Sequence, residues 1–206
     1  NEGVDLERLA DKYKVVDLII YVGGISPMLE GEEGDAGGLE GFVGGDRTTI
    51  ALPAIQTEVM KRLNLLGKSL IFICMSGGAM SFNWEVENLP VIIQAWYGGQ
   101  STGTALADIL FGRYNPSGKL PVTFYHSDAD LPPIKDYSMS NRTYRYFGGD
   151  VLYPFGYGLH YGETNYDGLS VDKAESDVNE PVEVFVNVTN DSRYTVNEIV
   201  QLYIRH

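Results

Sequence analysis

The sequence predicts an α/β fold, a mostly parallel sheet covered by helices on both faces, followed by a truncated all-β segment. Continuous apolar runs over residues 15–22, 70–75 and 91–96 each end near paired glycines, and helical patterns separate them. This alternation is typical of a buried parallel sheet. From about residue 164 the chain alternates apolar and polar residues, as antiparallel strands do. We therefore expect an α/β sandwich domain over residues 1–163 and an incomplete β domain over 164–206.

The first half of the α/β domain contains a helix, a strand, a long loop and a second helix. A helical pattern covers residues 5–13, and the strand of residues 15–22 leads into a glycine-rich loop over 23–49. A loop of this length in a compact domain is usually functional or disordered. After Leu52-Pro53 a helix begins, and Gly67 can end it. Its apolar face should contain Ile55, Val59, Leu63 and Leu66.

The second half supplies the other strands. Residues 69–80 read as a buried strand with a glycine turn, 91–96 as a third strand, 103–112 as a helix and 119–125 as a shorter fourth strand. In a parallel sheet the working loops lie beyond the carboxyl ends of the strands. The loops after the first three strands all occupy that position.

The C-terminal part of the chain divides into an aromatic segment and a β segment. The tyrosine-rich stretch over residues 141–162 should pack against the α/β body, because it has too many aromatic residues for a solvated loop. Residues 180–190 and 195–206 alternate like strands of one antiparallel sheet with an open edge.

The composition excludes several classes of partner. The formal net charge of −13 argues against nucleic acid and anionic membranes as partners, whereas a neutral ligand is unaffected. No apolar run is long enough to span a membrane.

The cysteine and histidine positions indicate neither a metal site nor a cofactor. His126, His160 and His206 lie far apart and near no cysteine. The single cysteine, Cys74, lies inside an apolar run, so we expect a buried and inert thiol.

Motifs for nucleotide binding and serine hydrolysis fail on spacing. The glycines at 98, 99 and 103 do not form a dinucleotide fingerprint, and the stretch 112–119 has one residue too many for a P-loop. Ser76 lies after a strand but outside the frame of a nucleophile elbow.

Three carboxylates follow the first strand, in the loop YVGGISPMLEGEEG. Glycoside hydrolysis uses two carboxyl groups, one of which must stay protonated near neutral pH. Glu30, Glu32 and Glu33 lie close enough in sequence to raise one another's pKa. From these residues alone, a solvated acidic loop remains the favoured interpretation and a catalytic acid the alternative.

The order of motifs resembles the carboxyl-terminal half of a family 3 glycoside hydrolase of the β-xylosidase or β-glucosidase type. The motifs are GGISPMLEGEEG and GGDRTTIALP, MSGGAM, AWYGGQSTGTALADILFGRYNPSGKLPVTF, NRTYRYF, LYPFGYGLHY and NEIVQLYIR. The family's plan is a (β/α)8 barrel, an α/β sandwich and a fibronectin type III-like domain. The resemblance therefore implies the sandwich over residues 1–163 and the start of a fibronectin type III-like domain over 164–206.

The resemblance also implies how the chemistry is divided. The nucleophile would be an aspartate on the barrel, outside this chain, and the general acid/base a glutamate of the loop. Glu30 is the first choice, Glu32 the second and Glu33 the third. Asp46-Arg47 would close the loop as an ion pair or a cap for the next helix, and Trp96 would be a packing residue.

The implied parent is a retaining exo-β-glycosidase acting on a β-linked oligosaccharide or aryl glycoside, with the barrel domain of the same chain as its partner. It would need no cofactor, and export to the periplasm or outside the cell is expected for such a substrate. The fragment alone should be inactive. The alternative is a non-catalytic sugar-binding or support module of such an enzyme.

Overall fold

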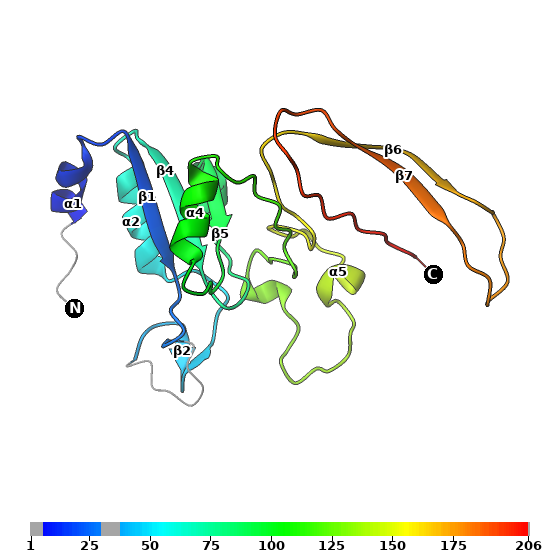
Figure 1. Cartoon of the computed structure of the whole chain (residues 1–206). Coiled ribbons are helices and arrows are strands. Elements are labelled where there is room, and N and C mark those ends of the chain that lie inside the picture. Colours follow the sequence, from blue (N-terminus) through cyan, green and yellow to red (C-terminus); the bar gives the residue numbers. More distant parts are fainter. Residues whose placement is uncertain (1–5, 30–37, 206) are drawn as a thin grey trace. The chain divides into compact units, whose positions relative to one another are not determined.

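A computed structural model describes residues 6–29 and 38–205 of the 206-residue chain (Figure 1). The chain forms two compact units. We call Asn1–Thr102 with Pro121–Phe155 the sheet unit, and Gly103–Leu120 with Gly156–His206 the hairpin unit. Each is described by itself. The predicted boundary at residue 163 between two structural domains stays a prediction.

The sheet unit contains a three-stranded parallel sheet in the order β1-β4-β5, as the apolar runs predict (Figure 1). A small antiparallel hairpin, β2 paired with β3, lies between β1 and α2 in the sequence. The elements are α1 (Leu6–Tyr13), β1 (Leu18–Gly24), β2 (Phe42–Val43), β3 (Asp46–Arg47), α2 (Ala54–Asn64), β4 (Ser69–Met75), α3 (Asn83–Asn88), β5 (Val91–Gln94), a short 3₁₀ helix (Asp128–Asp130) and α5 (Thr143–Tyr146).

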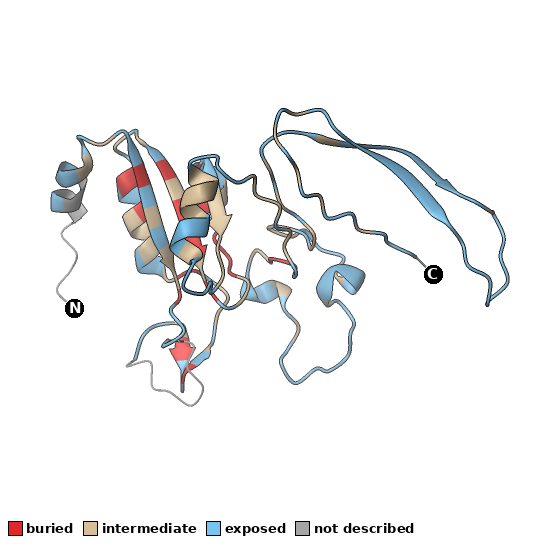
Figure 2. Ribbon diagram, in the orientation of Figure 1, coloured by how far each residue is buried: buried red, intermediate tan, exposed pale blue. Residues whose placement is uncertain are grey.

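The core of this unit surrounds the central strand β4. Leu70, Phe72 and Cys74 on β4 are fully buried, and α2 packs against both β1 and β4 (Figure 2). The edge strand β1 is buried on one face only, since Ile19 is buried while Ile20 is 45% exposed. The expectation that the first strand is buried on both faces is therefore wrong for the described residues.

A chain of aromatic contacts connects the sheet to the segment after residue 121. The rings of Tyr21 and Phe72, Phe72 and Phe82, Phe82 and Phe124, and Trp96 and Phe124 each lie with centroids 6.0 Å apart. Edge-to-face and tilted contacts at this distance stabilise a core beyond simple burial.

One local prediction is wrong, and another is right only in part. Residues 119–125 form no strand but one antiparallel bridge between Phe124 and Tyr153. Pro121 has no N–H to donate within a sheet, which disfavours regular pairing there. The predicted apolar face of α2 is right for Leu63, which is buried together with Met60, and wrong for Ile55, which is 57% exposed. The short helix α3 was not predicted, because six residues carry little periodic signal.

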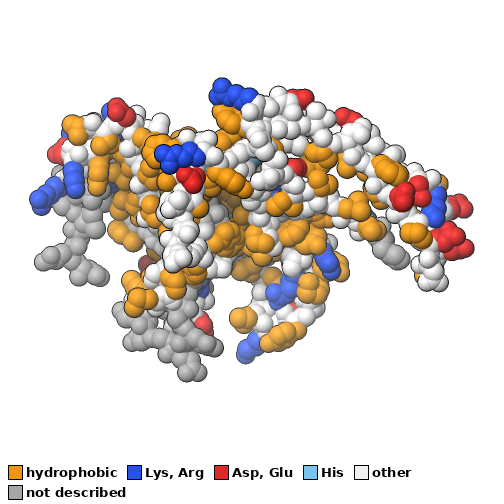
Figure 3. All heavy atoms as spheres, viewed as in Figure 1, with side chains coloured by type: hydrophobic (Ala, Val, Ile, Leu, Met, Phe, Trp, Pro, Cys, Tyr) orange, Lys and Arg blue, Asp and Glu red, His pale blue; other side chains and the backbone are white. Residues whose placement is uncertain are grey.

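The hairpin unit contains nearly all of α4 (Thr102–Leu110) and the antiparallel pair β6 (Thr164–Val171) and β7 (Val184–Asn190). A register shift interrupts the pairing between Asp167 and Ser170. Charged side chains gather at the far end of this hairpin (Figure 3). The predicted strand over residues 195–206 is not found in the described stretch 195–205, where the chain pairs with no strand.

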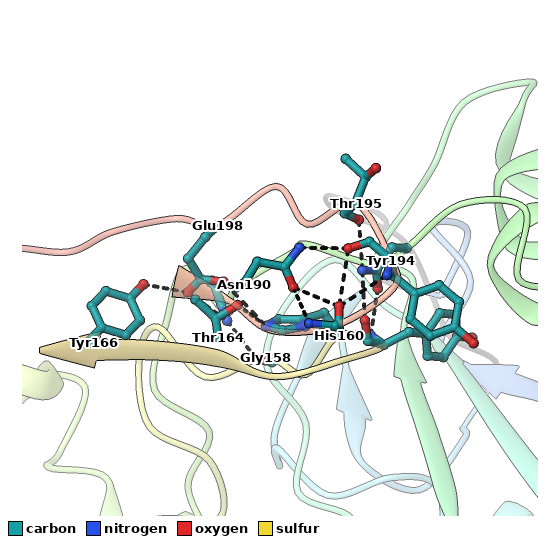
Figure 4. Close-up of polar contacts among 12 residues, drawn as sticks. Gly158, His160, Thr164, Tyr166, Asn190, Tyr194, Thr195 and Glu198 are labelled. Atoms are coloured by element: carbon teal, nitrogen blue, oxygen red, sulfur yellow. Dashed lines mark hydrogen bonds and ion pairs between the residues drawn. The ribbon is translucent and has the colours of Figure 1, made fainter. Parts of the chain in front are cut away.

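Polar contacts, rather than a buried apolar core, connect the segments of the hairpin unit. None of its described residues is fully buried (Figure 2). Tyr166 on β6 donates to Glu198 Oε1 at 2.8 Å, and His160 Nε2 lies 3.6 Å from Glu198 Oε2 (Figure 4). Lys119 Nζ lies 3.6 Å from Glu198 Oε1. The side chains of Lys119, His160 and Glu198 are only 14%, 10% and 15% exposed. Such shielded charges interact more strongly than surface pairs.

Asn115 forms a second polar junction in this unit. Its Nδ2 donates to the carbonyls of Tyr161 and Thr195, each at 3.0 Å, and its Oδ1 accepts from Tyr161 N at 2.6 Å. One amide thus joins three separate stretches of the chain.

We predict that Glu198→Ala weakens the hairpin unit, because it leaves Lys119 and His160 without their carboxylate and Tyr166 without its acceptor. The expected loss is about 2 kcal/mol in the opening free energy of β6 and β7 amides, measured by hydrogen exchange. Glu163→Ala, at an exposed carboxylate next to β6, is the matched control and should change little. Equal protection in both variants would contradict the role of Glu198.

We also predict that Cys74 resists alkylation in the folded protein. Burial, as the largest cause, and the nearby Glu85 raise the pKa of its thiol to about 12, although Ser76 and Arg47 act in the opposite direction. The thiolate is the reactive form, so at a pH near 8 almost none is present. Iodoacetamide should label Cys74 only after unfolding in guanidinium, and rapid labelling of the native chain would refute the assignment.

Candidate functional site

The carboxyl ends of β1, β4 and β5 share one edge of the parallel sheet. The chain leaves this edge after Gly24, after Met75 and after Gln94. This is where ligands bind in open α/β sheets. The candidate site is therefore built from the loops that follow these three strands.

The predicted acid/base candidates Glu30, Glu32 and Glu33 lie outside the described residues. The structure describes the two ends of their loop, residues 23–29 and 38–47. How these ends are held determines where the loop leaves the sheet and where it returns.

The first end of the loop is fixed by four hydrogen bonds. Gly24 N–H donates to Gln56 Oε1 at 2.8 Å, and Gln56 Nε2 donates back to Gly24 O at 2.7 Å. Ile25 N–H donates to Met75 O at 2.8 Å, and Tyr97 OH donates to Ile25 O at 2.6 Å. Helix α2, β4 and the segment after β5 thus all fix the point where the acidic loop begins.

The second end of the loop is the β2–β3 hairpin. Gly44 and Gly45 turn it with φ of +61° and +86°, values that glycine adopts readily. Arg47 follows the turn and donates through Nη1 to Ala79 O and through Nε to Thr49 O, each at 3.3 Å. The hairpin is therefore connected to the turn after β4.

The predicted capping role of Asp46-Arg47 is wrong. Helix α2 begins at Ala54 after Pro53 and has no side-chain cap. Proline is well suited to a helix start without one, since its φ is preset. Arg47 instead connects two loops.

Ser76 is held as a structural residue of the turn after β4. It is fully buried, donates to Gly78 O at 2.8 Å and accepts from Gln94 Nε2 at 3.0 Å. These contacts agree with the rejection of a serine-hydrolase site.

A pocket of about 510 Å³ opens beside these loops. Its walls come from the turn after β4, from Trp96 after β5, from Ile50 and from the segment after residue 120. The lining residues are Ile50, Gly77, Gly78, Ala79, Met80, Trp96, Pro121, Val122, Thr123, Tyr125 and Leu131. No sequence pattern predicted this pocket, because residues 121–125 read as a strand.

A buried carboxylate, Glu85, was also missed. It is 1% exposed and accepts a hydrogen bond of 2.5 Å from Thr57 Oγ1. Burial raises the pKa of the Tyr21 hydroxyl, and electrostatic repulsion from Glu85 raises it further. Glu85 joins α2 to α3 and lines a separate hollow of about 600 Å³ between them.

Within residues 6–29 and 38–205, no group of three or more His, Cys, Asp or Glu side chains is arranged to hold a metal ion. Among the helices in these ranges, none has both the length and the apolar character needed to cross a membrane.

Residues 4–161 match the glycosyl hydrolase family 3 C-terminal domain. The xylan 1,4-beta-xylosidase of Xylanibacter ruminicola is 46% identical over 204 residues, which cover 99% of this chain and 23% of that protein. The thermostable beta-glucosidase B of Acetivibrio thermocellus is 31% identical over 100% of this chain and 28% of its own length.

Solved structures show the same likeness. The GH3 beta-glucosidase of Bifidobacterium adolescentis matches 93% of this chain with a TM-score of 0.76 and 29% identity, over 29% of its own chain. A GH3 exo-beta-xylosidase in complex with a xylobiose aziridine activity-based probe matches 79% of this chain and 21% of its own, with a TM-score of 0.67 and 30% identity. The chain thus spans about a quarter of the length of the curated relatives it matches.

We predict that Gly24→Ala displaces the first end of the acidic loop. Gly24 has a φ of +113°, and a Cβ there would lie 1.9 Å from Met75 O, a backbone atom that cannot move aside alone. The expected loss of unfolding free energy is about 3 kcal/mol or more in denaturant titration. Gly38→Ala is the control, since Gly38 also has a positive φ of +73° but nothing lies within 4 Å of its added Cβ. Its cost should be about 1 kcal/mol, and equal losses would show that the contact with Met75 is unimportant.

Proposed function

Because the chain belongs to glycosyl hydrolase family 3, as its C-terminal domain, we propose that it is part of a retaining exo-β-glycosidase. The enzyme releases single sugars, xylose in the first place and glucose as the other choice, from the non-reducing ends of β-linked oligosaccharides. The 46% identity to a xylan 1,4-beta-xylosidase over 99% of the chain carries this proposal.

The part of the mechanism that we assign to this chain is the general acid/base. In a retaining mechanism one carboxylic acid protonates the leaving oxygen and then, as a carboxylate, activates water, while a second carboxylate forms the glycosyl-enzyme. We assign the first role to the loop of residues 23–46, with Glu30 first, Glu32 second and Glu33 third. The nucleophile is assigned to a barrel domain of the same parent chain, so this chain alone is inactive.

The anchoring of the loop supports this assignment. The hydrogen bonds of Gly24 and Ile25 at one end, and of Arg47 at the other, hold both ends of the acidic segment at the carboxyl edge of the sheet. A catalytic acid needs a fixed position relative to the scissile bond.

The segment after residue 163 is proposed as the start of a fibronectin type III-like domain. The antiparallel pairing of β6 with β7 supports this. The open edges of this pair are consistent with further strands elsewhere in the parent.

The decisive test replaces each candidate with glutamine in the full-length enzyme. The variant that removes the acid/base should lose about 10²- to 10⁴-fold in kcat/KM on 4-nitrophenyl β-xyloside. It should lose much less on a 2,4-dinitrophenyl glycoside, whose leaving group needs no proton. Added azide should restore turnover and give a β-glycosyl azide, because the glycosyl-enzyme still forms.

Glu40→Gln is the matched control, since Glu40 is an exposed carboxylate of the same loop. It should retain activity. If no variant at 30, 32 or 33 shows azide rescue, the chain is instead a support module of the enzyme. If the unmodified enzyme cleaves neither β-xylosides nor β-glucosides, the proposed activity itself is wrong.

A further inference from the structure

The hollow of about 600 Å³ between α2 and α3 has no role in the catalysis proposed above. One of its walls comes from residues 51–61, at the start of α2, and the other from residues 81–85, at the start of α3. Its volume falls within the range of about 300–1,000 Å³ that is typical of small-molecule sites. We therefore asked which ligand its side chains would suit.

A short backbone pairing separates this hollow from the pocket of about 510 Å³. Ala51 and Ser81 form an isolated parallel bridge and line the hollow, whereas the residues just before them, Ile50 and Met80, line the pocket. Successive residues of extended chains point to opposite sides. The two sites are therefore distinct, and a ligand in the hollow leaves the pocket free.

A buried carboxylate in the hollow has no cation to balance it. Glu85 lines the hollow and is fully buried, and in the described part of the chain its one side-chain partner is Thr57, with no ion pair. Burying a carboxylate is costly unless it is paired or well hydrogen-bonded. A ligand with hydroxyl groups would donate the missing hydrogen bonds.

Two other side chains of the hollow have donors to spare. The ammonium of Lys61 lies over the Trp84 ring, 5.9 Å from its centroid, which is at the limit of about 6 Å for a cation–π contact. Among residues 6–29 and 38–205 this ammonium has no ion pair, and the indole N–H has no acceptor. The Lys61 side chain is exposed, so it can exchange this weak contact for a ligand. The ring itself provides an apolar surface.

The charges around the hollow favour a neutral ligand. Glu58, the other charged lining residue, is paired with Arg62 at 3.1 Å. One cation, Lys61, and one anion, Glu85, are left, and their charges cancel. An anionic ligand would be repelled by the carboxylate and a cationic one by the ammonium. A sugar is neutral, has a face of C–H groups that packs on an aromatic ring, and has hydroxyls that both donate and accept.

We propose that this hollow is a second carbohydrate-binding site, which holds a neutral β-linked oligosaccharide away from the bond that is cleaved. The choice of a β-linked chain rests on the proposed glycosidase function. One sugar ring packs on Trp84, while its hydroxyls donate to Glu85 and accept from Lys61. Binding at a second site raises the local concentration of a long substrate and does nothing for a small one.

The test measures the binding of xylotetraose and cellotetraose to the full-length enzyme by isothermal titration calorimetry. The active site is first blocked with a 2-deoxy-2-fluoro-β-xyloside, which traps the glycosyl-enzyme, so that the tetrasaccharide is not digested. The blocked enzyme should still bind at least one tetrasaccharide. Lys61→Ala and Trp84→Ala should each raise its dissociation constant about tenfold or more. In the unblocked enzyme both should raise the KM for that tetrasaccharide and leave the KM for 4-nitrophenyl β-xyloside unchanged.

Lys135→Ala and Tyr137→Ala are the matched controls, because both residues are exposed in the same unit and line no part of the hollow. Lys61 is exposed, so its variant tests the proposal even if Trp84→Ala folds poorly. The proposal would be overturned by absence of tetrasaccharide binding, by unchanged binding in the Lys61 variant, or by an equal loss in the controls. Tighter binding of tetragalacturonate, an anionic chain, would overturn it as well.

Failure of the proposed function gives a different result from failure of this site. An enzyme that cleaves no β-glycoside would refute the proposed function. It would also leave the tetrasaccharides intact, so the calorimetry would then be done without blocking and would still decide whether the hollow binds them.

Discussion

The close approach of β1 and β4 at Gly24 is the constraint on which the candidate site depends. Parallel pairing brings Gly24 opposite Met75, and no side chain fits between the two backbones there. A glycine with positive φ then redirects the chain, and Gln56 satisfies both of its backbone polar groups. The direction in which the acidic segment departs is therefore set by backbone contacts.

The two units are stabilised by different forces. In the sheet unit, burial of Leu70, Phe72 and their aromatic neighbours removes apolar surface from water, and this kind of stabilisation tolerates changes of salt and pH. In the hairpin unit, Glu198 and Asn115 collect donors from distant segments, and the strands themselves remain exposed. Because the charged groups around Glu198 are only 10–15% exposed, salt screens them less than it screens surface pairs.

The sheet was predictable because β4 and β5 are short, continuous apolar runs separated by helical patterns. Such runs are typical of the buried strands of a parallel sheet. The false strand at residues 119–125 shows the limit of that argument, since Pro121 breaks pairing that the apolar pattern favours. The pocket could not be predicted, because Trp96 and Tyr125 come from segments brought together only by the fold. The same holds for Glu198 and Lys119, which are 79 residues apart. The residues alone favoured a solvated acidic loop, and the family resemblance made it the candidate for the acid/base. Its glutamates lie outside the described part, so this role stays a prediction.

The sheet unit is discontinuous in sequence, since residues 103–120 belong to the hairpin unit and the chain then returns with Pro121–Phe155. During synthesis the N-terminal strands emerge first, and Phe72 can pack on Phe82 before the rest of the unit exists. Phe124, which contacts both Phe82 and Trp96, arrives only after the intervening stretch. Until then a nascent chain exposes aromatic surface that the finished unit covers. The time for which this surface stays uncovered is set by the length of the intervening stretch, residues 103–120.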